Sequence, residues 1–446
     1  MQLQRRIRSI IYFLMHKYTQ HFIKALISLI LVSSTYASTV VAISDNQIDI
    51  GHEKLRAHLY RNFSEYQNGY DTDRNGKVDD LNGWNFIHDT NKVFDPSLIG
   101  TFDPNVYKYY EVRRRKTLKI ATDEELEWYK EIRKDDDFMD HRSDFSSYTH
   151  GSHVTCLAMN TKKLPYEMKS WDLKFMPIRY LGDDEVGLFK KKEFTPSKYS
   201  RSYYKIQNIK NYLNYYQSWM IKKFEETVKY SASKSKIYHA SWGQSWEPAY
   251  DMVNELFQDE FDISEKEADK KYKSTITKFR NDYMKGLMKK GQRVVENYSN
   301  LLFVFSAGNK KDNTDEMLHY PSSIIADNVI SVGAIDEDNE DKAYFSNFGK
   351  TTVSLFAPGV AIYSCSPGDR YIPINGTSQA APHVTNIAAK IFAMADYYAK
   401  PISPAHVKDI LLSSATKKAK LSDLCVSGGT LNESAAIMTA RRFLRW

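Results

Sequence analysis

The chain has 446 residues, 42% of them hydrophobic, which is enough to bury the core of one large α/β domain or of two smaller ones. Internal repeats and low-complexity tracts are absent from the sequence, which excludes a solenoid and a disordered scaffold. The formal net charge of +7 comes mainly from residues 1–37, which hold five Lys/Arg and no acidic residue, and the basic stretches elsewhere are mixed with acidic residues, so we predict no nucleic-acid partner.

The N-terminal segment has the organisation of a secretory signal peptide. Residues 25–32 form an apolar run that is too short to span a bilayer comfortably, and they lie between a basic region and the small-residue stretch 33–37. Counted from Met15 the leader has an ordinary length, so our hypothesis is that Met15 is the true start. We predict a signal peptide over residues 1–37, a secreted or periplasmic protein and no stable membrane span; an uncleaved anchor or a helix of the fold is the alternative.

After the leader, strands and helices alternate along the chain, which favours a parallel sheet covered by helices on both faces. Strands are predicted at residues 39–43, 174–181, 236–241, 300–306 and 329–332, and helices at 205–229, 248–298, 384–398 and 404–413. Residues 88–145 and about 255–295 interrupt this order with stretches rich in charge, which we interpret as solvated surface insertions on one domain of residues 38–446.

An acidic loop follows the first strand. Asp71, Asp73, Asn75 and Asp79 place side-chain oxygens at alternating positions, with a glycine at the sixth position of the loop. This spacing is the one with which a loop wraps a hard cation, so we predict a structural Ca²⁺ held by these four residues. Asn82 occupies the position of the final bidentate Glu of an EF-hand, and a plain Asp/Asn/Gly turn is the alternative.

Two histidines and one cysteine cluster in the middle of the chain. His150 and His153 lie in the sequence HGSHV, one helical turn apart, and no third ligand stands nearby that would complete a metal site. Cys156 follows them, and with Cys365 and Cys425 it makes a set too small for a disulfide framework or a zinc site. One disulfide plus a free thiol is possible without an indication of which pair forms; we interpret Cys156 as a buried inert thiol, with a regulatory thiol as the alternative.

The sequence NGTSQAAPHV at 375–384 places Ser378 in a turn of small residues that opens a predicted helix. A serine hydroxyl is a weak nucleophile that needs a neighbouring base, and the first backbone N–H groups of a helix can stabilise an oxyanion. Taken alone, however, Gly-Thr-Ser before a helix is an ordinary helix cap.

Together these motifs resemble the subtilase family of serine peptidases. The family's nucleophile motif is Gly-Thr-Ser, any residue, then Ala-Ala-Pro-His-Val, and residues 376–384 match it completely. The sequence HGSHV resembles the family's His-Gly-Thr-His-Val, and FVFSAGN at 303–309 resembles its strand ending in Ala-Gly-Asn. VVAISD at 40–45 looks like the family's strand ending in Asp-Thr-Gly. The resemblance covers roughly residues 38–442.

The resemblance implies the role of each motif. Ser378 is the nucleophile, His150 the general base and later general acid, and Asp45 the carboxylate that orients His150, in the chain order Asp, His, Ser. Asn309 and the Ser378 backbone N–H form the oxyanion hole. Asp49 is the rival of Asp45, but it lies beyond the predicted strand end.

The sequence departs from the family pattern beside two of these residues. Asn46 and Gln47 replace the usual Thr-Gly after Asp45, and because Gly tolerates unusual backbone angles we expect Gln47 to strain or reshape this turn. Thr155 and Cys156 replace the usual Ala-Gly after the histidine motif, and we expect His153 to be structural.

The resemblance also implies that a peptide binds as an extended strand between two segments of the enzyme. Its primary pocket would lie between Ser241, Trp242 and Gly243 on one side and Ser306, Ala307 and Gly308 on the other. Trp242 stands where an aliphatic residue is common, so it either belongs to the core or narrows the pocket.

We therefore predict a three-layer α/β, subtilisin-like fold and a secreted, monomeric serine endopeptidase that acts on proteins or peptides through an acyl-enzyme intermediate. A pseudo-peptidase that binds peptides without cutting them and a narrow-specificity processing peptidase are the alternatives. Because residue 38 leads almost directly into the first strand, we expect no pro-domain between the leader and that strand.

Overall fold

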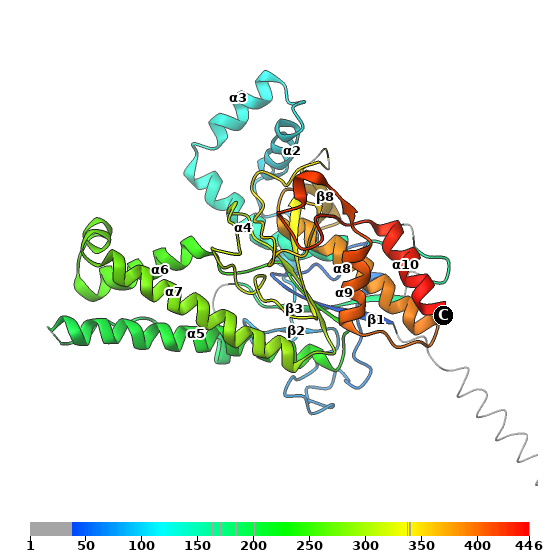
Figure 1. Cartoon of the computed structure of the whole chain (residues 1–446), viewed down its shortest axis with the longest axis horizontal. Helices are drawn as coiled ribbons and strands as arrows, with labels where there is room; N and C mark the ends of the chain where they lie inside the picture. The colour runs from blue at the N-terminus through cyan, green and yellow to red at the C-terminus, as the bar shows by residue number, and fades with distance from the viewer. Residues whose placement is uncertain are drawn as a thin grey trace, which may run out of the picture. The chain divides into compact units, whose positions relative to one another are not determined.

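The computed structural model of the chain describes residues 38–445 apart from 163, 170–171, 183–184, 200, 337 and 339. The predicted signal peptide lies outside these residues. The described part contains a central sheet with helices on both faces (Figure 1). Among the described helices we find none that is both long and apolar enough to cross a membrane.

In the described residues the central sheet has nine strands in the order β10-β11-β7-β6-β5-β4-β1-β3-β2, and all neighbours are parallel except β10 and β11. Its strands are β1 (Thr39–Asp45), β2 (Trp84–Asn85), β3 (Leu173–Arg179), β4 (Ile237–Ala240), β5 (Leu302–Ser306), β6 (Val329–Ile335), β7 (Leu355–Pro358), β10 (Thr416–Lys417) and β11 (Gly429–Thr430). A separate antiparallel hairpin consists of β8 (Ile362–Ser366) and β9 (Arg370–Ile374).

The α-helices are α2 (Asn105–Thr117), α3 (Asp123–Ile132), α4 (Asp136–Ala158), α5 (Ser202–Ala232), α6 (Trp246–Phe261), α7 (Glu265–Asn297), α8 (Thr377–Tyr397), α9 (Pro404–Ser413) and α10 (Glu433–Arg445). Short 3₁₀ helices are η1 (Arg56–His58), η2 (Pro96–Leu98), η4 (Gly187–Phe189) and η5 (Ala419–Leu421).

Strand β1 shows why the sheet is covered on both faces. All seven of its residues are buried, which explains why the sequence reads as a continuous apolar run rather than an alternating one. Val41 and Ile43 face the core formed with α4, α8, α9 and α10, whereas Val40 and Ala42 face the core formed with α5, α6 and α7. Figure 1 shows the two groups of helices on opposite sides of the strands. The predicted three-layer α/β fold is confirmed.

The order of the strands locates the place where a site is expected. Chain order reverses at β1, which has β3 on one side and β4 on the other. In open parallel sheets, ligands bind at the carboxyl ends of the strands beside such a reversal. Asp45 ends β1, and Ser241 directly follows the end of β4, so both lie at this point.

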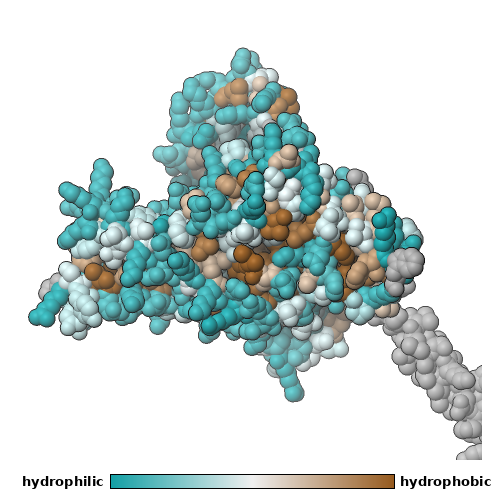
Figure 2. Space-filling view, in the orientation of Figure 1, coloured by the Kyte–Doolittle hydropathy of each residue, from teal (hydrophilic) through white to brown (hydrophobic). Residues whose placement is uncertain are grey.

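The two charge-rich ranges contain more buried apolar surface than solvated insertions would need. Residues 88–145 include α2, α3 and the first part of α4, and they enclose a small core of their own in which Tyr110 and Phe145 meet Ile372 of β9. The range 255–295 covers the end of α6 and most of α7, whose apolar face is buried in a core shared with α5 and α6. Hydrophilic residues still predominate on the visible surface over α2 and α3 (Figure 2).

Two helix boundaries differ from prediction. The predicted helix 248–298 is interrupted at Asp262, which takes a left-handed conformation (φ 53°), and α7 then begins with a capping box between Ser264 and Glu267. Helix α8 begins at Thr377, seven residues before the predicted start, because the polar stretch that includes Pro382 belongs to the helix.

Candidate active site

Asp45 and His150 form the central contact of the site. Asp45 is the fully buried last residue of β1, and His150 lies on α4. His150 Nδ1 is 2.6 Å from Asp45 Oδ1. Burial lowers the pKa of His150, but the attraction and hydrogen bond of Asp45 outweigh it, so the pKa lies above its ordinary value. With Nδ1–H donating to Asp45, Nε2 of the neutral ring is left as the basic nitrogen.

Gly151 allows this contact. A Cβ atom on Gly151 would lie 2.4 Å from the carbonyl oxygen of Gln47 and 3.0 Å from that of Asn46. No side chain fits there, so the glycine lets α4 approach the turn that follows β1. The close approach brings the preceding residue, His150, within reach of Asp45.

The expectation that Gln47 strains this turn is wrong. Gln47 is not among the non-glycine residues with positive φ, so it needs no conformation that favours glycine. Its side-chain Oε1 accepts a hydrogen bond from Asp95 N at 2.8 Å, which ties the turn to the 88–145 range. The rival Asp49 uses both carboxylate oxygens elsewhere, accepting from the N–H groups of Gly51 and Gly368.

Ser378 is the second residue of α8, where the backbone N–H has no partner inside the helix. Helix α8 contacts α4, and Ser378 is 8% exposed. Its hydroxyl donates to the carbonyl oxygen of Ser241 at 3.1 Å. Among the described hydrogen bonds none joins Ser378 to His150, so the hydroxyl must rotate toward the imidazole before it can transfer its proton.

A second set of contacts, which the sequence analysis missed, fixes the first turn of α8. Pro382 has no N–H, so the carbonyl of Ser378 lacks its usual helical donor. The Ser241 hydroxyl donates to that carbonyl at 3.2 Å and is itself 2.9 Å from His239 Nε2, while His239 Nδ1 is 2.7 Å from Thr385 Oγ1. Burial lowers the pKa of His239 to about 4, so the ring is neutral and donates from Nε2. In the sequence, the proline four residues after Ser378 was the sign that the Ser378 carbonyl needs a donor from outside the helix.

Asn309 lies beside the start of α8 with its amide in a defined orientation. Its Oδ1 accepts from both the backbone N–H and the hydroxyl of Thr377, at 2.9 and 3.0 Å. A Cβ atom built on Gly376 would lie 3.6 Å from Asn309 Nδ2 and 3.6 Å from Ser378 N. The two proposed oxyanion donors therefore border the same space next to Gly376, which the side chain of Gln379 also approaches, with Oε1 2.7 Å from that Cβ position.

The six predicted substrate-binding residues fall into two neighbouring segments. Ser241 and Gly243 follow β4, and Ser306, Ala307 and Gly308 end or follow the adjacent parallel strand β5. A Cβ atom on Gly243 would meet the His319 ring at 2.3 Å, and Gly308 has a φ of +100°, so both segments depend on glycine.

Of the two roles predicted for Trp242, the structure favours a place in the core. It is 8% exposed, and its ring stacks on Tyr180 with centroids 4.2 Å apart. Its indole Nε1 donates to Ser44 Oγ at 3.2 Å. The idea that Trp242 narrows the pocket is not supported by this placement.

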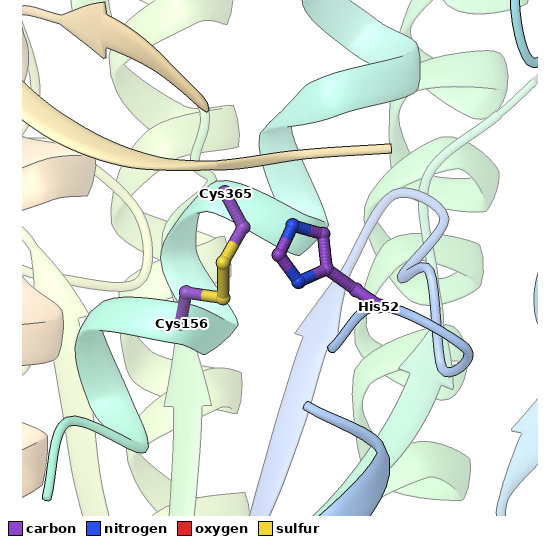
Figure 3. A group of neighbouring side chains, drawn as sticks. All are labelled: His52, Cys156 and Cys365. Carbon is purple, nitrogen blue, oxygen red and sulfur yellow. A yellow bond between two sulfur atoms is a disulfide. The ribbon is translucent and has the colours of Figure 1, made fainter. Parts of the chain in front are cut away.

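Cys156 is not a free thiol: it forms a disulfide with Cys365, so our interpretation of an inert thiol is wrong (Figure 3). The bond joins α4 to β8, and Cys425 is free and buried. His52 lies beside the two sulfurs, but these are bonded to each other and are unavailable to a metal.

His153 also ties α4 to the β8–β9 hairpin, since its Nε2 is 3.1 Å from the carbonyl oxygens of Ile362 and Ile372. Burial lowers the pKa of His153 to about 3.

The acidic loop brings together only part of the predicted calcium set. Asp71 and Asp73 converge with Glu65, with ligand oxygens within 4.8 Å of one another. Glu65 was missed because it precedes the loop by six residues. Asp79 lies outside this group, and its carboxylate accepts from the N–H groups of Asn68 and Gly69. Asn75 Oδ1 accepts from Lys77 N, and its Nδ2 donates to Asp80.

Comparison with known proteins identifies one family and several relatives that match only part of the chain. The model of a family described as "Subtilase family" matches residues 37–428. The extracellular basic protease of Dichelobacter nodosus is 34% identical over 161 residues, which are 34% of this chain and 26% of that protein. Subtilisin DY of Bacillus licheniformis is 36% identical over 140 residues, which are 31% of this chain and 47% of that protein. The matched stretches thus span less than half the length of these relatives.

Among solved structures, one titled as a lanthipeptide protease is 17% identical to this chain with a TM-score of 0.48, covering 90% of this chain and 87% of that one. A self-cleaved protease domain of PatA is 18% identical with a TM-score of 0.45, covering 91% and 97%.

Proposed function

This chain belongs to the subtilase family of serine peptidases, and on that premise we propose that it is a secreted serine endopeptidase that acts through Asp45, His150 and Ser378. The observation that carries the proposal is the 2.6 Å contact between His150 Nδ1 and the buried Asp45 carboxylate, at the sheet edge where α8 presents Ser378. Hydrolysis of casein or of a quenched-peptide library, with Ser378→Ala as the matched inactive variant, tests it.

The proposed reaction follows from this geometry. The Ser378 hydroxyl turns from Ser241 to His150, whose Nε2 takes the proton as the oxygen attacks the peptide carbonyl carbon. Asn309 Nδ2 and the Ser378 N–H donate to the resulting oxyanion. The imidazolium gives its proton to the leaving amine as the C–N bond breaks, which leaves an acyl ester on Ser378. Water, deprotonated by His150, then hydrolyses the ester. Asp45 stays ionised throughout and holds the imidazole in position.

Two observations support export to an oxidising compartment. The matched relative from Dichelobacter nodosus is named an extracellular protease. The disulfide between Cys156 and Cys365 is of the kind that persists in secreted or periplasmic proteins and is rare in the cytosol. We propose that the protein acts there on protein or peptide substrates as a monomer.

The altered residues beside the motifs give little support to a pseudo-peptidase. Gln47 binds Asp95 N without a positive φ, Thr155 Oγ1 donates to the carbonyl oxygen of Gly151 at 2.7 Å, and Cys156 is paired in the disulfide. Each of these side chains is accommodated without displacing Asp45 from His150.

Asn309→Ala is expected to lower kcat by about 100- to 1,000-fold with little change in KM, a magnitude known from removal of the oxyanion donor in subtilisin. Alanine removes the Nδ2 donor, but it also removes the Oδ1 that caps Thr377. Asn309→Asp is the matched control, since it keeps an acceptor for Thr377 and lacks the amide donor. Both variants should lose activity in steady-state assays; full activity in Asn309→Asp would contradict the assigned role.

We also propose that Glu65, Asp71 and Asp73 hold a structural Ca²⁺. The residues fit a hard cation because three carboxylates converge, Glu65 is only 2% exposed, and backbone N–H groups of the loop orient their oxygens. Lys234 Nζ lies 3.9 Å from Asp73 and offsets part of the repulsion among the three carboxylates. A bound ion would neutralise the remaining repulsion and hold the loop.

Removing this ion with excess EDTA is expected to lower the midpoint of thermal unfolding by about 5 °C, because a ligand that binds only the folded state stabilises it. Differential scanning calorimetry with EDTA and with added Ca²⁺ measures the shift. Glu65→Gln should abolish the difference between the two conditions, whereas Asp251→Asn, at an exposed position on α6, should preserve it. Equal midpoints of the unchanged protein in both conditions would refute the calcium site.

A further inference from the structure

A pocket of about 850 Å³ lies between the helices of the 88–145 range and the segment that follows β6. Its lining includes five cationic side chains, from Arg113 and Lys116 of α2, Arg133 after α3, Arg142 of α4, and Lys342. Three tyrosines and two aspartates are also among the lining residues. Nothing in the proposed reaction uses this pocket.

Most of these cations have no negative partner among the residues that the structure describes. In the described part of the chain, none of Arg113, Lys116, Arg133 and Arg142 takes part in an ion pair or a side-chain hydrogen bond, and Arg142 Nε is buried without any partner. Their nearest described attractions are to aromatic rings: Lys116 and Arg133 lie over Tyr129, and Arg142 lies over Tyr109.

Four other cations on or beside these helices behave differently, whereas a fifth, Lys108, lies over Trp128 and has no ion pair with a described residue. Arg114 pairs with Glu111 and Arg115 with Glu125, while Lys130 and Lys134 pair with glutamates three residues before them. None of these four lines the pocket. Among the described residues of the 88–145 range, the arginines away from the pocket are paired and those at the pocket are not, which is the arrangement expected where a ligand supplies the negative charge.

The two carboxylates in the lining do not satisfy these cations. Asp336 accepts from the backbone N–H groups of Glu340 and Asp341, and Asp341 accepts from the N–H of Lys342 and lies 3.7 Å from Lys420 Nζ. Both are therefore held by their own loop, and Asp341 also lies near a lysine outside the pocket. Among the described lining residues, positive charge remains in excess, and an anionic ligand would neutralise it.

The elements that line the pocket lead to three of the proposed active-site residues. Arg142 precedes His150 by eight residues on α4, which corresponds to about 12 Å along the helix. Thr117, at the end of α2, accepts from Asn375 Nδ2 at 3.4 Å, three residues before Ser378. Phe345, next to the pocket residue Tyr344, accepts through its carbonyl oxygen from Lys311 N, two residues after Asn309.

The pocket is separate from the predicted acyl-side segments. The predicted acyl-side residues at 241–243 and 306–308 are all described, and none of them lines it. A peptide held by those segments and passing Ser378 would continue toward the pocket with the residues after the scissile bond.

We infer that this pocket binds acidic side chains of the substrate on the leaving-group side of the scissile bond. The inference rests on the proposed peptidase function and makes it more specific. Guanidinium groups match carboxylates in geometry and can bind them bidentately, so aspartate and glutamate are the side chains that this lining recognises. Substrates with acidic residues after the cleaved bond would be preferred over neutral ones.

The test uses two quenched peptides that are identical before the scissile bond and carry Asp-Glu or Asn-Gln after it. We expect the full-length protein to show a kcat/KM for the acidic peptide at least about tenfold above that for the neutral one. In Arg113→Gln/Arg133→Gln this ratio should fall toward one. The matched control Arg114→Gln/Lys134→Gln removes two charges from the same helical segment outside the pocket and should keep the ratio of the unchanged protein.

A charge-reversed variant guards against a loss that arises from misfolding. Arg113→Glu/Arg133→Glu should prefer a peptide with Lys-Lys after the scissile bond. Equal kcat/KM for the acidic and neutral peptides in the unchanged protein, or an unaltered ratio in Arg113→Gln/Arg133→Gln, would overturn the inference.

If no peptide is cleaved, the proposed function fails, and binding alone then decides about the pocket. Fluorescence anisotropy of a labelled acidic peptide on the Ser378→Ala protein should show binding that weakens with added salt and about tenfold when Arg113 and Arg133 are also replaced by Gln. Equal affinity for the acidic and neutral peptides in this assay would overturn the pocket assignment independently of catalysis.

Discussion

Ser378→Ala is expected to lower kcat on a cleavable peptide by about a million-fold, the order of magnitude known for loss of the nucleophilic serine in subtilisin. The variant lacks the oxygen that would form the acyl ester, while the oxyanion donors remain and leave only a small residual rate. The fold should be unaffected, because the hydroxyl makes a single described hydrogen bond, to the Ser241 carbonyl oxygen.

Steady-state assays at high enzyme concentration measure the loss, and thermal unfolding verifies the fold. Ser218→Ala is a suitable control, since Ser218 lies on α5 with its hydroxyl bonded to Asn214 O. A Ser378→Ala protein that retains more than a few per cent of activity would show that Ser378 is not the nucleophile.

Asp45→Asn is expected to lower kcat/KM by about 10,000-fold without removing any atom that touches the substrate, by analogy with the same change in other serine peptidases. An asparagine can donate to His150 Nδ1, which places the ring proton on Nε2 and removes the base. It also removes the charge that raises the pKa of His150.

The pH profile separates this positioning role from a loss of folding. In the unchanged protein, activity should fall as the pH falls through the raised pKa of His150, because protonated His150 cannot act as a base. In Asp45→Asn that pKa is lower, so the acid limb of the residual kcat/KM should move to lower pH. Asp49→Asn, the matched control at the rival carboxylate, should keep the acid limb in place. The reverse result would make Asp49 the partner of His150.

The sequence motifs were sufficient to name the contact between Asp45 and His150, because these motifs combine a strand end or a helix with the residue that acts there, but the predicted start of α8 was seven residues too late. The motif positions alone could not show how the chain fits around them. Gly151 is a glycine because the turn carbonyls approach it, and Gln47 needs no unusual angle because its side chain binds Asp95 N. Such contacts depend on the tertiary structure and not on local spacing.

The parts that the sequence could not predict join residues far apart in the chain. Cys156 and Cys365 are 209 residues apart, so no local pattern indicates their pairing. Glu65 replaces Asp79 in the acidic cluster because the loop folds back on the segment before it. The basic pocket combines α2 and α4 with residues after β6, and in sequence its arginines look the same as the paired ones beside them.

Labelling with a fluorophosphonate tests the central claim most directly, because the reagent reacts only with a serine activated by a neighbouring base. Intact-mass spectrometry of the folded protein at neutral pH should show one adduct, and peptide mapping should place it on Ser378. The adduct should be absent from Ser378→Ala and form far more slowly in Asp45→Asn. No adduct on the folded, unchanged protein, or an adduct on another serine such as Ser241, would contradict the proposed site.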